Sequence, residues 1–305
     1  MLVGGFMMKV VNNINEANCI THSGTMHADE VFATAFLDLY LDDVRVFRTN
    51  KVENVADDVF VYDIGRGKYD HHQIDAEKRD NGITYSSLGL LWREFGRDFL
   101  KKKGYSNIEE MFNGIDKDLI EGIDADDNGF FPKIECNYKA RTLPTIIKIF
   151  NPSYDSGENE SEQFLKAVKL AKMIFEEEVV YINGKVISDQ KVTEIINNSD
   201  TSKGYLYLDE YFPYEDAIFN HPLGDKILFV AFPSNRGGYA IKTVSKSCDD
   251  KTARKLFPEE WAGLQDSELE RISGIVGLRF CHTGRFIVNC ATEEAMDKVL
   301  EVVCK

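Results

Sequence analysis

Residues 18–30 read Asn18-Cys19-Ile20-Thr21-His22-Ser23-Gly24-Thr25-Met26-His27-Ala28-Asp29-Glu30. This stretch predicts a strand, a polar turn and the start of a helix. The apolar lead ends at His22, and the stretch from Asp29 to Leu41 has neither proline nor glycine, which favours a helix. Two β-rich runs follow, at 44–48 and 58–63. Strands that alternate with a helix in this way predict a parallel α/β sheet with its site at the carboxyl ends of the strands.

Histidine and aspartate side chains gather at four places in this predicted domain. They are the trio His22, His27 and Asp29, the single Asp63, the run Asp70-His71-His72, and the run Asp124-Ala125-Asp126-Asp127-Asn128-Gly129. Imidazole and carboxylate together suit Mn²⁺, Fe²⁺ or Zn²⁺. Two such ions about 3.5–4 Å apart can clamp the attacking and leaving oxygens of a phosphate ester. The sequence therefore predicts a two-metal hydrolase.

Each cluster taken alone has a structural alternative. Asp29 can cap a helix, and Asp63 precedes a glycine as in an ordinary turn. Asp127 can belong to a turn or a calcium-like loop, although no glutamate closes a twelve-residue EF-hand loop after Asp124. The adjacent His71 and His72 have little structural rationale. The combination of four clusters in one α/β domain favours a single metal centre.

Length and composition restrict the class of protein. A chain of 305 residues can form two domains, and no apolar run approaches the ~20 residues of a membrane span. The first residues lack the features of a signal peptide. The six cysteines are scattered without a C-x-x-C pair, which argues against a structural zinc site and a disulfide framework. We therefore expect a cytoplasmic protein with reduced thiols.

Further elements suggest two domains. Helices are expected at 86–95, 108–123, 144–150, 162–182 and 186–196, with Asn183-Gly184 ending the fourth. Strands are expected at 205–208, 227–232, 239–244, 278–282 and 285–288, with a hairpin at Thr283-Gly284 and a closing helix at 292–303. We predict a catalytic domain over residues 1–200, a smaller substrate-binding α/β domain over 201–305, and an active site in the cleft between them.

The four clusters resemble the motifs of the DHH phosphoesterase superfamily, which read His-x-x-x-x-His-x-Asp, a lone Asp, Asp-His-His and a final Asp. Within that superfamily the chain is most similar to the Myg-type (melanocyte proliferating gene) family, over nearly its whole length. Other segments that carry the likeness are Ser86-Ser87-Leu88-Gly89-Leu90, Phe150-Asn151-Pro152, Phe257-Pro258-Glu259-Glu260-Trp261-Ala262-Gly263-Leu264 and Ser273-Gly274-Ile275-Val276-Gly277. The resemblance implies a DHH-like N-terminal domain and a metal-dependent phosphoesterase or exonuclease.

The resemblance also implies two divalent cations, with Mn²⁺ favoured over Mg²⁺, Fe²⁺ and Zn²⁺. One ion would be held by His22, His27 and Asp63, and the other by Asp29, Asp63, His71 and Asp127. Asp124 is the alternative to Asp127. Most DHH enzymes carry an aspartate where this chain has His27, a replacement shared with the Myg-type family. The replacement removes a negative charge and is expected to change the metal preference or to weaken one metal position.

Three residues are implied in catalysis by the same resemblance. Asp63 would bridge the two ions, and a hydroxide activated by both would attack phosphorus. His72 would be a ligand or a donor to a phosphate oxygen. Asp70 would orient a histidine from behind.

DHH enzymes also present a glycine-rich segment from their second domain to the substrate. The candidates here are Arg236, Gly237 and Gly238, and the pair His282 and Arg285. Glycine lets backbone N–H groups approach a phosphate, and arginine can pair with it bidentately. Two hairpin turns with exposed arginines are an equal alternative, because turn glycines are common.

Three hypotheses of function remain after these observations. The leading one is a Mn²⁺-type phosphodiesterase or exonuclease acting on short or single-stranded RNA or DNA. The net charge of −15 argues against tight binding to long nucleic acid, which relies on many Lys and Arg contacts. One alternative is a metal-dependent amide or peptide hydrolase, although the sequence has no H-E-x-x-H helix. The other is a non-catalytic metal-binding protein. No membrane partner is expected, and the sequence makes no prediction of the oligomeric state.

Overall fold

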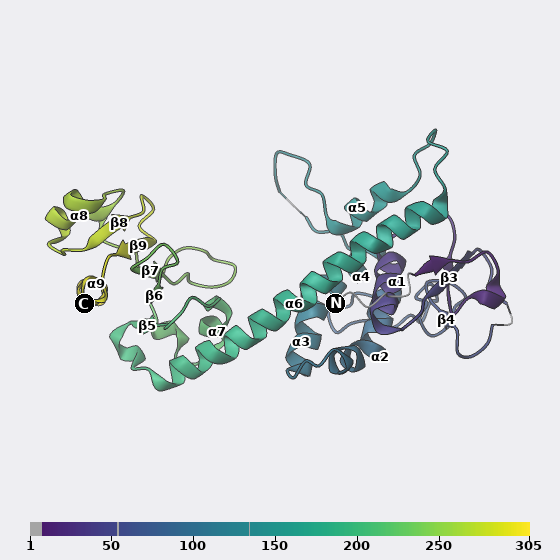
Figure 1. Cartoon of the computed structure of the whole chain (residues 1–305), viewed down its shortest axis with the longest axis horizontal. Helices are drawn as coiled ribbons and strands as arrows, with labels where there is room; N and C mark the ends of the chain where they lie inside the picture. The colour runs from purple at the N-terminus through teal and green to yellow at the C-terminus, as the bar shows by residue number, and fades with distance from the viewer. Residues whose placement is uncertain (1–7, 54, 134) are drawn as a thin grey trace. The chain divides into compact units, whose positions relative to one another are not determined.

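A computed structural model describes residues 8–53, 55–133 and 135–305 of the chain. The chain divides into two compact units, Met1–Asn183 and Gly184–Lys305 (Figure 1). Each unit combines a β-sheet with helices. The predicted α/β class is therefore confirmed, while the functions that we assign to the two domains stay predictions. In the part of the chain that is described, no helix is both long and apolar enough to cross a membrane.

The first unit is built on a four-stranded sheet in which every pair of neighbours is parallel. The strand order is β1-β3-β2-β4, with bounds β1 Lys9–Val10, β2 Cys19–His22, β3 Arg45–Thr49 and β4 Phe60–Val61. His22 is the last residue of β2, and Asp63 follows the carboxyl end of β4 by two residues. The predicted parallel sheet, with ligand candidates at its carboxyl edge, is therefore confirmed.

Two buried helices support this edge of the sheet. Helix α1 spans Ala28–Tyr40, as the sequence predicts, and its residues from Ala28 to Leu37 are all buried. Helix α2 spans Ser87–Lys102 and runs beyond the predicted 86–95. The ring of Phe36 on α1 lies 5.5 Å from the ring of Trp92 on α2 and 5.7 Å from that of Phe175. These aromatic contacts fix α1, and with it the residues at its first turn.

A chain of short helices leads to the last ligand candidate. Helix α3 (Ile108–Ile115) continues through a π-helical turn, Asp116–Ile120, into α4 (Glu121–Asp127). The predicted helix 108–123 is thus longer than expected, and Asp127 lies at its end rather than in a turn. Gly129 follows with a φ of 79°, a left-handed conformation that glycine adopts without strain. Helix α5 (Leu143–Ile147) and a 3₁₀ turn, Lys148–Phe150, confirm the predicted helix at 144–150.

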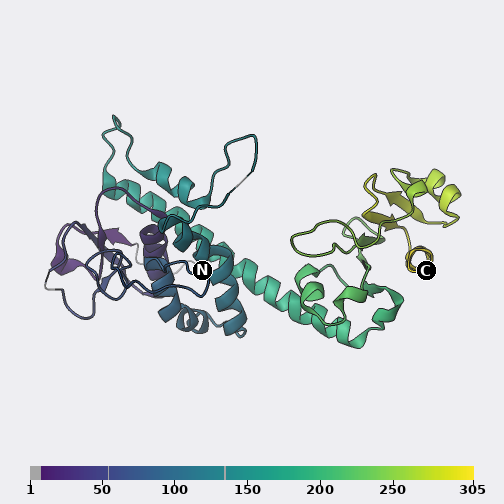
Figure 2. The same ribbon diagram turned by 180° about the vertical axis from the view of Figure 1, so that it is seen from behind.

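The prediction that a helix ends at Asn183-Gly184 is wrong. Helix α6 runs without interruption over Glu160–Asn198 and joins the predicted helices 162–182 and 186–196, as Figures 1 and 2 show. A glycine inside a helix costs only about 1 kcal/mol relative to alanine. Ile182 is buried in the first unit, and Val192 and Ile196 belong to a core of the second unit. Burial on both sides of Gly184 outweighs that cost.

The second unit contains a mixed five-stranded sheet of order β5-β6-β7-β9-β8, in which only β5 and β6 pair in parallel. The strands are β5 Tyr205–Tyr207, β6 Phe229–Pro233, β7 Tyr239–Thr243, β8 Leu278–Cys281 and β9 Ile287–Cys290. The helices are α7 Glu215–Asn220, α8 Asp266–Ser273 and α9 Glu293–Val303. The five predicted strands, the hairpin at Thr283-Gly284 and the closing helix are confirmed.

Candidate metal centre

Asp63 occupies the middle of the candidate site. Its backbone φ of 55° is left-handed, a conformation that aspartate tolerates better than most residues, and it turns the chain at the end of β4. One carboxylate oxygen, Oδ2, lies 3.1 Å from His22 Nε2. The other, Oδ1, is hydrogen-bonded to His71 Nε2 at 3.1 Å. A single carboxylate thus links the histidine at the end of β2 with one from the Asp-His-His motif.

His71 connects Asp63 with the helical carboxylates. Its Nε2 lies 3.0 Å from Asp127 Oδ2 and 3.9 Å from Asp29 Oδ2. Asp29 stands in the first turn of α1, and its Oδ2 accepts a hydrogen bond from Ser87 Oγ at 2.8 Å. The four residues predicted to hold one cation, Asp29, Asp63, His71 and Asp127, are therefore brought together.

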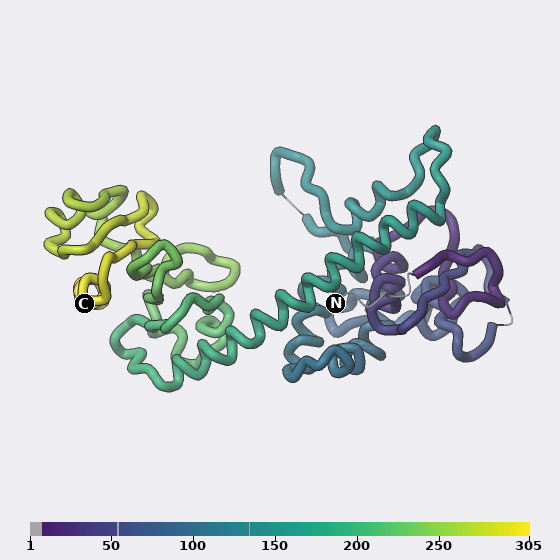
Figure 3. The backbone as a smooth tube through the Cα atoms, in the orientation of Figure 1, coloured from purple at the N-terminus to yellow at the C-terminus, as the bar shows by residue number. Residues whose placement is uncertain are grey.

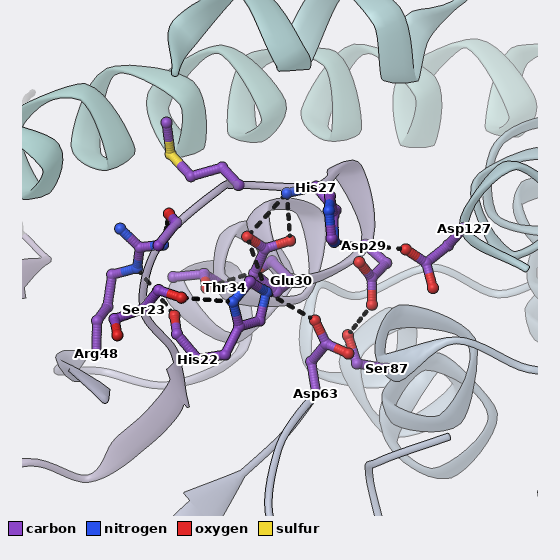
Figure 4. Close-up of polar contacts among 12 residues, drawn as sticks. His22, Ser23, His27, Asp29, Glu30, Thr34, Arg48, Asp63, Ser87 and Asp127 are labelled. Atoms are coloured by element: carbon purple, nitrogen blue, oxygen red, sulfur yellow. Dashed lines mark hydrogen bonds and ion pairs between the residues drawn. The ribbon is translucent and has the colours of Figure 1, made fainter. Parts of the chain in front are cut away.

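The residues predicted for the other cation also meet, and a fourth residue joins them. His22, His27, Glu30 and Asp63 each offer one ligand atom, and these atoms all lie within 4.8 Å of one another. In Figure 4 the ring of His22 lies between the carboxylates of Glu30 and Asp63. Two further groups meet the same criterion, Asp63 with His71 and His72, and His27 with Asp29 and Asp127. The three groups share residues, so they form one continuous cluster able to hold divalent cations.

The electrostatics of the cluster favour bound cations. Burial and the neighbouring carboxylates of Asp63, Asp127 and Glu30 raise the pKa of Asp29 well above its ordinary value. Burial likewise raises the pKa of Glu30 to about 8. Asp29 Oδ1 is buried and has no hydrogen-bond partner among the described residues. Crowded, buried carboxylates with an unpartnered oxygen fit a cation that would neutralise them.

The same crowding raises the pKa values of the histidines, against the effect of burial. Burial lowers the pKa of His22, but Asp63 and Glu30 outweigh it and raise that pKa to about 9. Asp127 and Asp63 outweigh burial at His71 and raise its pKa to about 11. Both histidines, in turn, hold the pKa of Asp63 down at about 2 despite its burial. Cations that bind here would displace these two protons, since a metal ligand must be deprotonated.

His72 and Asp70 lie at the outer side of the cluster. Asp70 Oδ1 is 2.7 Å from His72 Nδ1, and Asp70 Oδ2 accepts from the backbone N–H of Arg66 at 2.6 Å. The imidazole of His72 is largely exposed, while Asp70 is buried. Asp70 therefore fixes the ring of His72, and only Nε2 of that ring is left to meet a ligand or a substrate oxygen.

Asp124, the alternative to Asp127, belongs to a different network. It is fully buried, and its Oδ1 accepts from Ser86 Oγ at 2.6 Å and from the Ser86 backbone N–H at 3.1 Å. Its Oδ2 accepts from Arg79 Nε at 2.8 Å, and the same guanidinium binds both oxygens of Asp116. None of the metal-binding groups found among the described residues includes Asp124. Asp124 anchors α4, and thus Asp127, to the start of α2.

The substrate-binding candidates of the second unit lie in two hairpin turns. Arg236 and Gly237 are exposed between β6 and β7, and a Cβ added to Gly238 would stand 2.1 Å from the carbonyl oxygen of Cys290. Gly238 is therefore required by the close approach of the end of β9. In the β8–β9 turn, His282 Nδ1 accepts from the Gly284 N–H at 2.9 Å, and Arg285 donates to the Phe257 carbonyl at 3.3 Å.

Comparisons with known proteins agree with the motifs. The family model MYG1_exonuc, described as an uncharacterised protein family (UPF0160), matches residues 18–302. The chain belongs to the MYG1_exonuc family. Every residue of the metal cluster lies inside the range that the family model matches.

Relatives in the MYG1_exonuc family come from bacteria and eukaryotes. A MYG1 protein of Chlamydia pneumoniae is 29% identical over 299 residues, covering 92% of this chain and 94% of the relative. A MYG1 protein of Dictyostelium discoideum is 28% identical over 310 residues, covering 92% and 94%. A human protein named MYG1 exonuclease is 26% identical over 316 residues, covering 90% and 82%. No solved structure matches the chain.

Sequence reasoning missed three residues that shape the centre. Glu30 accepts from the His27 backbone N–H at 3.0 Å, and its place three residues after His27 at a helix start is the signal that was available. Arg48, at the end of β3, donates to the carbonyls of His22 and Gly24. Ser87 holds Asp29. No local pattern marks the last two contacts, because they join distant parts of the chain.

We predict that Glu30→Gln weakens binding of Mn²⁺ about 10- to 100-fold, the usual effect of altering a residue next to a metal ligand. Glutamine keeps an acceptor for the His27 N–H but cannot supply the carboxylate that would face a bound cation. Calorimetric titration with Mn²⁺ measures the affinity, and the melting temperature without metal reports on the fold. Unchanged affinity with a lowered melting temperature would mean that Glu30 only caps α1.

Proposed function

We propose that the chain is a metal-dependent phosphodiesterase that removes nucleotides from the end of short or single-stranded nucleic acid. The observation that carries the proposal is the cluster of three overlapping histidine and carboxylate groups around Asp63. The names of the human and bovine relatives, each called MYG1 exonuclease, support the same activity. The net charge of −15 favours short single strands over long duplexes.

The donor set suits two divalent cations of the Mn²⁺ type. Mixed imidazole and carboxylate ligands favour Mn²⁺, Fe²⁺ or Zn²⁺ over Ca²⁺. We assign His22, His27 and Asp63, with Glu30 beside them, to one cation, and Asp29, Asp63, His71 and Asp127 to the other. When bound, the cations supply Lewis acidity and lower the pKa of water. A side chain that acts as a general base to deprotonate the attacking water is then not needed.

The protein's own side chains position the reacting groups. Asp63 holds the rings of His22 and His71 on opposite oxygens, at 3.1 Å each. Asp70 accepts from Nδ1–H of His72, which leaves Nε2 of the neutral ring free to act as a metal ligand and lets the protonated ring donate Nε2–H to a phosphate oxygen. In a DHH-like arrangement the second domain supplies further phosphate contacts, and Arg236, Gly237, His282 and Arg285 are the residues we propose for them. Gly238 has no side chain and so allows the backbone of the β6–β7 turn to pass close to Cys290.

The proposed activity is tested with end-labelled single-stranded RNA and DNA of about ten nucleotides. Metal-free protein is expected to be inactive, and restored Mn²⁺ is expected to produce stepwise shortening from one end. The measurement follows products on a denaturing gel, with a peptide library as the rival substrate. Shortening that needs Mn²⁺ supports the proposal. Cleavage of peptides alone, or metal binding without hydrolysis of any substrate, contradicts it.

A further inference from the structure

The segment between α4 and α5 is fixed beside the metal cluster at both of its ends. Its first end follows Asp127 directly, where Asn128 Nδ2 donates to the Thr84 carbonyl at 3.0 Å and the Phe130 N–H donates to Ala125 at 2.7 Å. Beyond its other end, Asn151 accepts from the Met26 N–H at 2.7 Å, one residue before His27. Figure 3 shows the chain leaving α4 and returning through α5. Both ends of this segment are therefore close to the metal cluster.

A hollow of about 400 Å³ lies against this segment. Its lining includes Asp126, the neighbour of Asp127, together with Phe131, Tyr138 and Lys148. That volume falls in the range of about 300–1,000 Å³ typical of small-ligand pockets. Phe131 and Tyr138 are 68% and 71% exposed, so their rings do not serve the hydrophobic core. Two exposed aromatic rings at the rim of a hollow can stack on a flat, apolar ligand.

The charge of the segment differs from that of the chain. Residues 130–148, which are most of the segment together with α5 and Lys148, include four basic residues and one acidic residue, whereas the whole chain has a net charge of −15. The basic residues are Lys133, Lys139, Arg141 and Lys148. Aromatic rings interleaved with basic side chains are the composition of surfaces that bind single-stranded nucleic acid, where bases stack on rings and cations meet phosphates.

We propose that this hollow binds a nucleobase of the substrate, stacked on Phe131 or Tyr138, while Lys148 contacts a phosphate next to the one at the metal cluster. The inference rests on the proposed function and specifies how the substrate is recognised. Stacking tolerates any base because every base presents a flat face. The site therefore selects for an unpaired base and against a duplex, without selecting for sequence.

The test compares Phe131→Ala and Tyr138→Ala with wild-type protein on a labelled thymidine pentanucleotide and on the same oligonucleotide carrying abasic sugars. Loss of one stacking ring is expected to raise KM for the pentanucleotide about 5- to 150-fold, with kcat little changed. The abasic oligonucleotide is expected to show the raised KM already with wild-type protein, and no further rise with the variants. Tyr138→Phe keeps the ring and should keep the wild-type KM.

Tyr154→Ala is the matched control, because Tyr154 is a fully exposed aromatic residue of the same unit that does not line the hollow. An unchanged KM in Phe131→Ala and Tyr138→Ala, with wild-type protein cleaving the pentanucleotide, overturns the inference and leaves the proposed function standing. Equal KM values of wild-type protein for the thymidine pentanucleotide and for its abasic version also overturn the inference. Failure of wild-type protein to cleave these oligonucleotides and the single-stranded RNA of the earlier test contradicts the proposed function itself, and a raised KM for peptides in the two variants assigns the hollow to peptides instead.

Discussion

Asp63→Asn is expected to lower kcat/KM for the Mn²⁺-dependent reaction by at least about 10³-fold, because charge stabilisation by metal ions contributes several kcal/mol and 1.36 kcal/mol corresponds to a factor of ten. Asp63 is the carboxylate shared by two of the three metal-binding groups. Asparagine has the same shape and also tolerates the left-handed φ of 55° at this position. The substitution therefore removes charge and ligand strength while keeping the backbone turn.

Three measurements separate this expectation from unfolding. The Mn²⁺ content of the variant after gel filtration should fall, its circular dichroism spectrum without metal should stay that of the folded protein, and its activity should be lost. Asp75→Asn is a matched control, since Asp75 is exposed and close in sequence to the same motif. Full activity of Asp63→Asn, or equal losses in both variants, would contradict the central role of Asp63.

Much of the first unit could be predicted from the stretch 18–41 because its signals are local. An apolar strand that ends in a histidine, followed by a helix without glycine or proline, is specified by neighbouring residues. The strand β2, the helix α1 and the contacts of His22 and Asp29 with the other ligands appear where the pattern places them. The ligands converge because parallel strands end at one edge of the sheet.

Local signals gave one wrong helix end and could not decide two features of the site, because distant contacts determine all three. Gly184 carries a helix-ending signal, yet α6 continues because residues on both sides of it are buried in different units. Asp124 and Asp127 look equivalent in the run Asp-Ala-Asp-Asp, and only the position of Arg79, far away in the sequence, distinguishes the buried anchor from the ligand candidate. Likewise, the role of Glu30, on helix α1, depends on the approach of His22 from the end of strand β2.

Gly89→Ala is expected to destabilise the protein by about 3–5 kcal/mol, the usual cost of breaking a buried ion pair. A Cβ at this position of α2 would stand 2.3 Å from Asp124 Oδ2 and 2.7 Å from Asp124 Oδ1. Asp124 is fully buried between Ser86 and Arg79 and cannot move without breaking those contacts. The gain of about 1 kcal/mol in helix propensity from replacing glycine is too small to compensate.

The same substitution should also reduce metal binding, because Asp124 holds the helix that carries Asp127. Denaturant unfolding gives the loss of stability, and titration with Mn²⁺ gives the loss of affinity. Gly122→Ala is the matched control: Gly122 is exposed on α4, and a Cβ there meets no atom within 4 Å among the described residues. Helix propensity alone should make that variant more stable by about 0.5–1 kcal/mol. Changes of opposite sign in the free energy of unfolding of the two variants would show that the contacts of Asp124, rather than backbone entropy, determine whether α2 accepts alanine at position 89. Equal and small changes would show that Asp124 can rotate away and that its contacts with Arg79 and Ser86 contribute little.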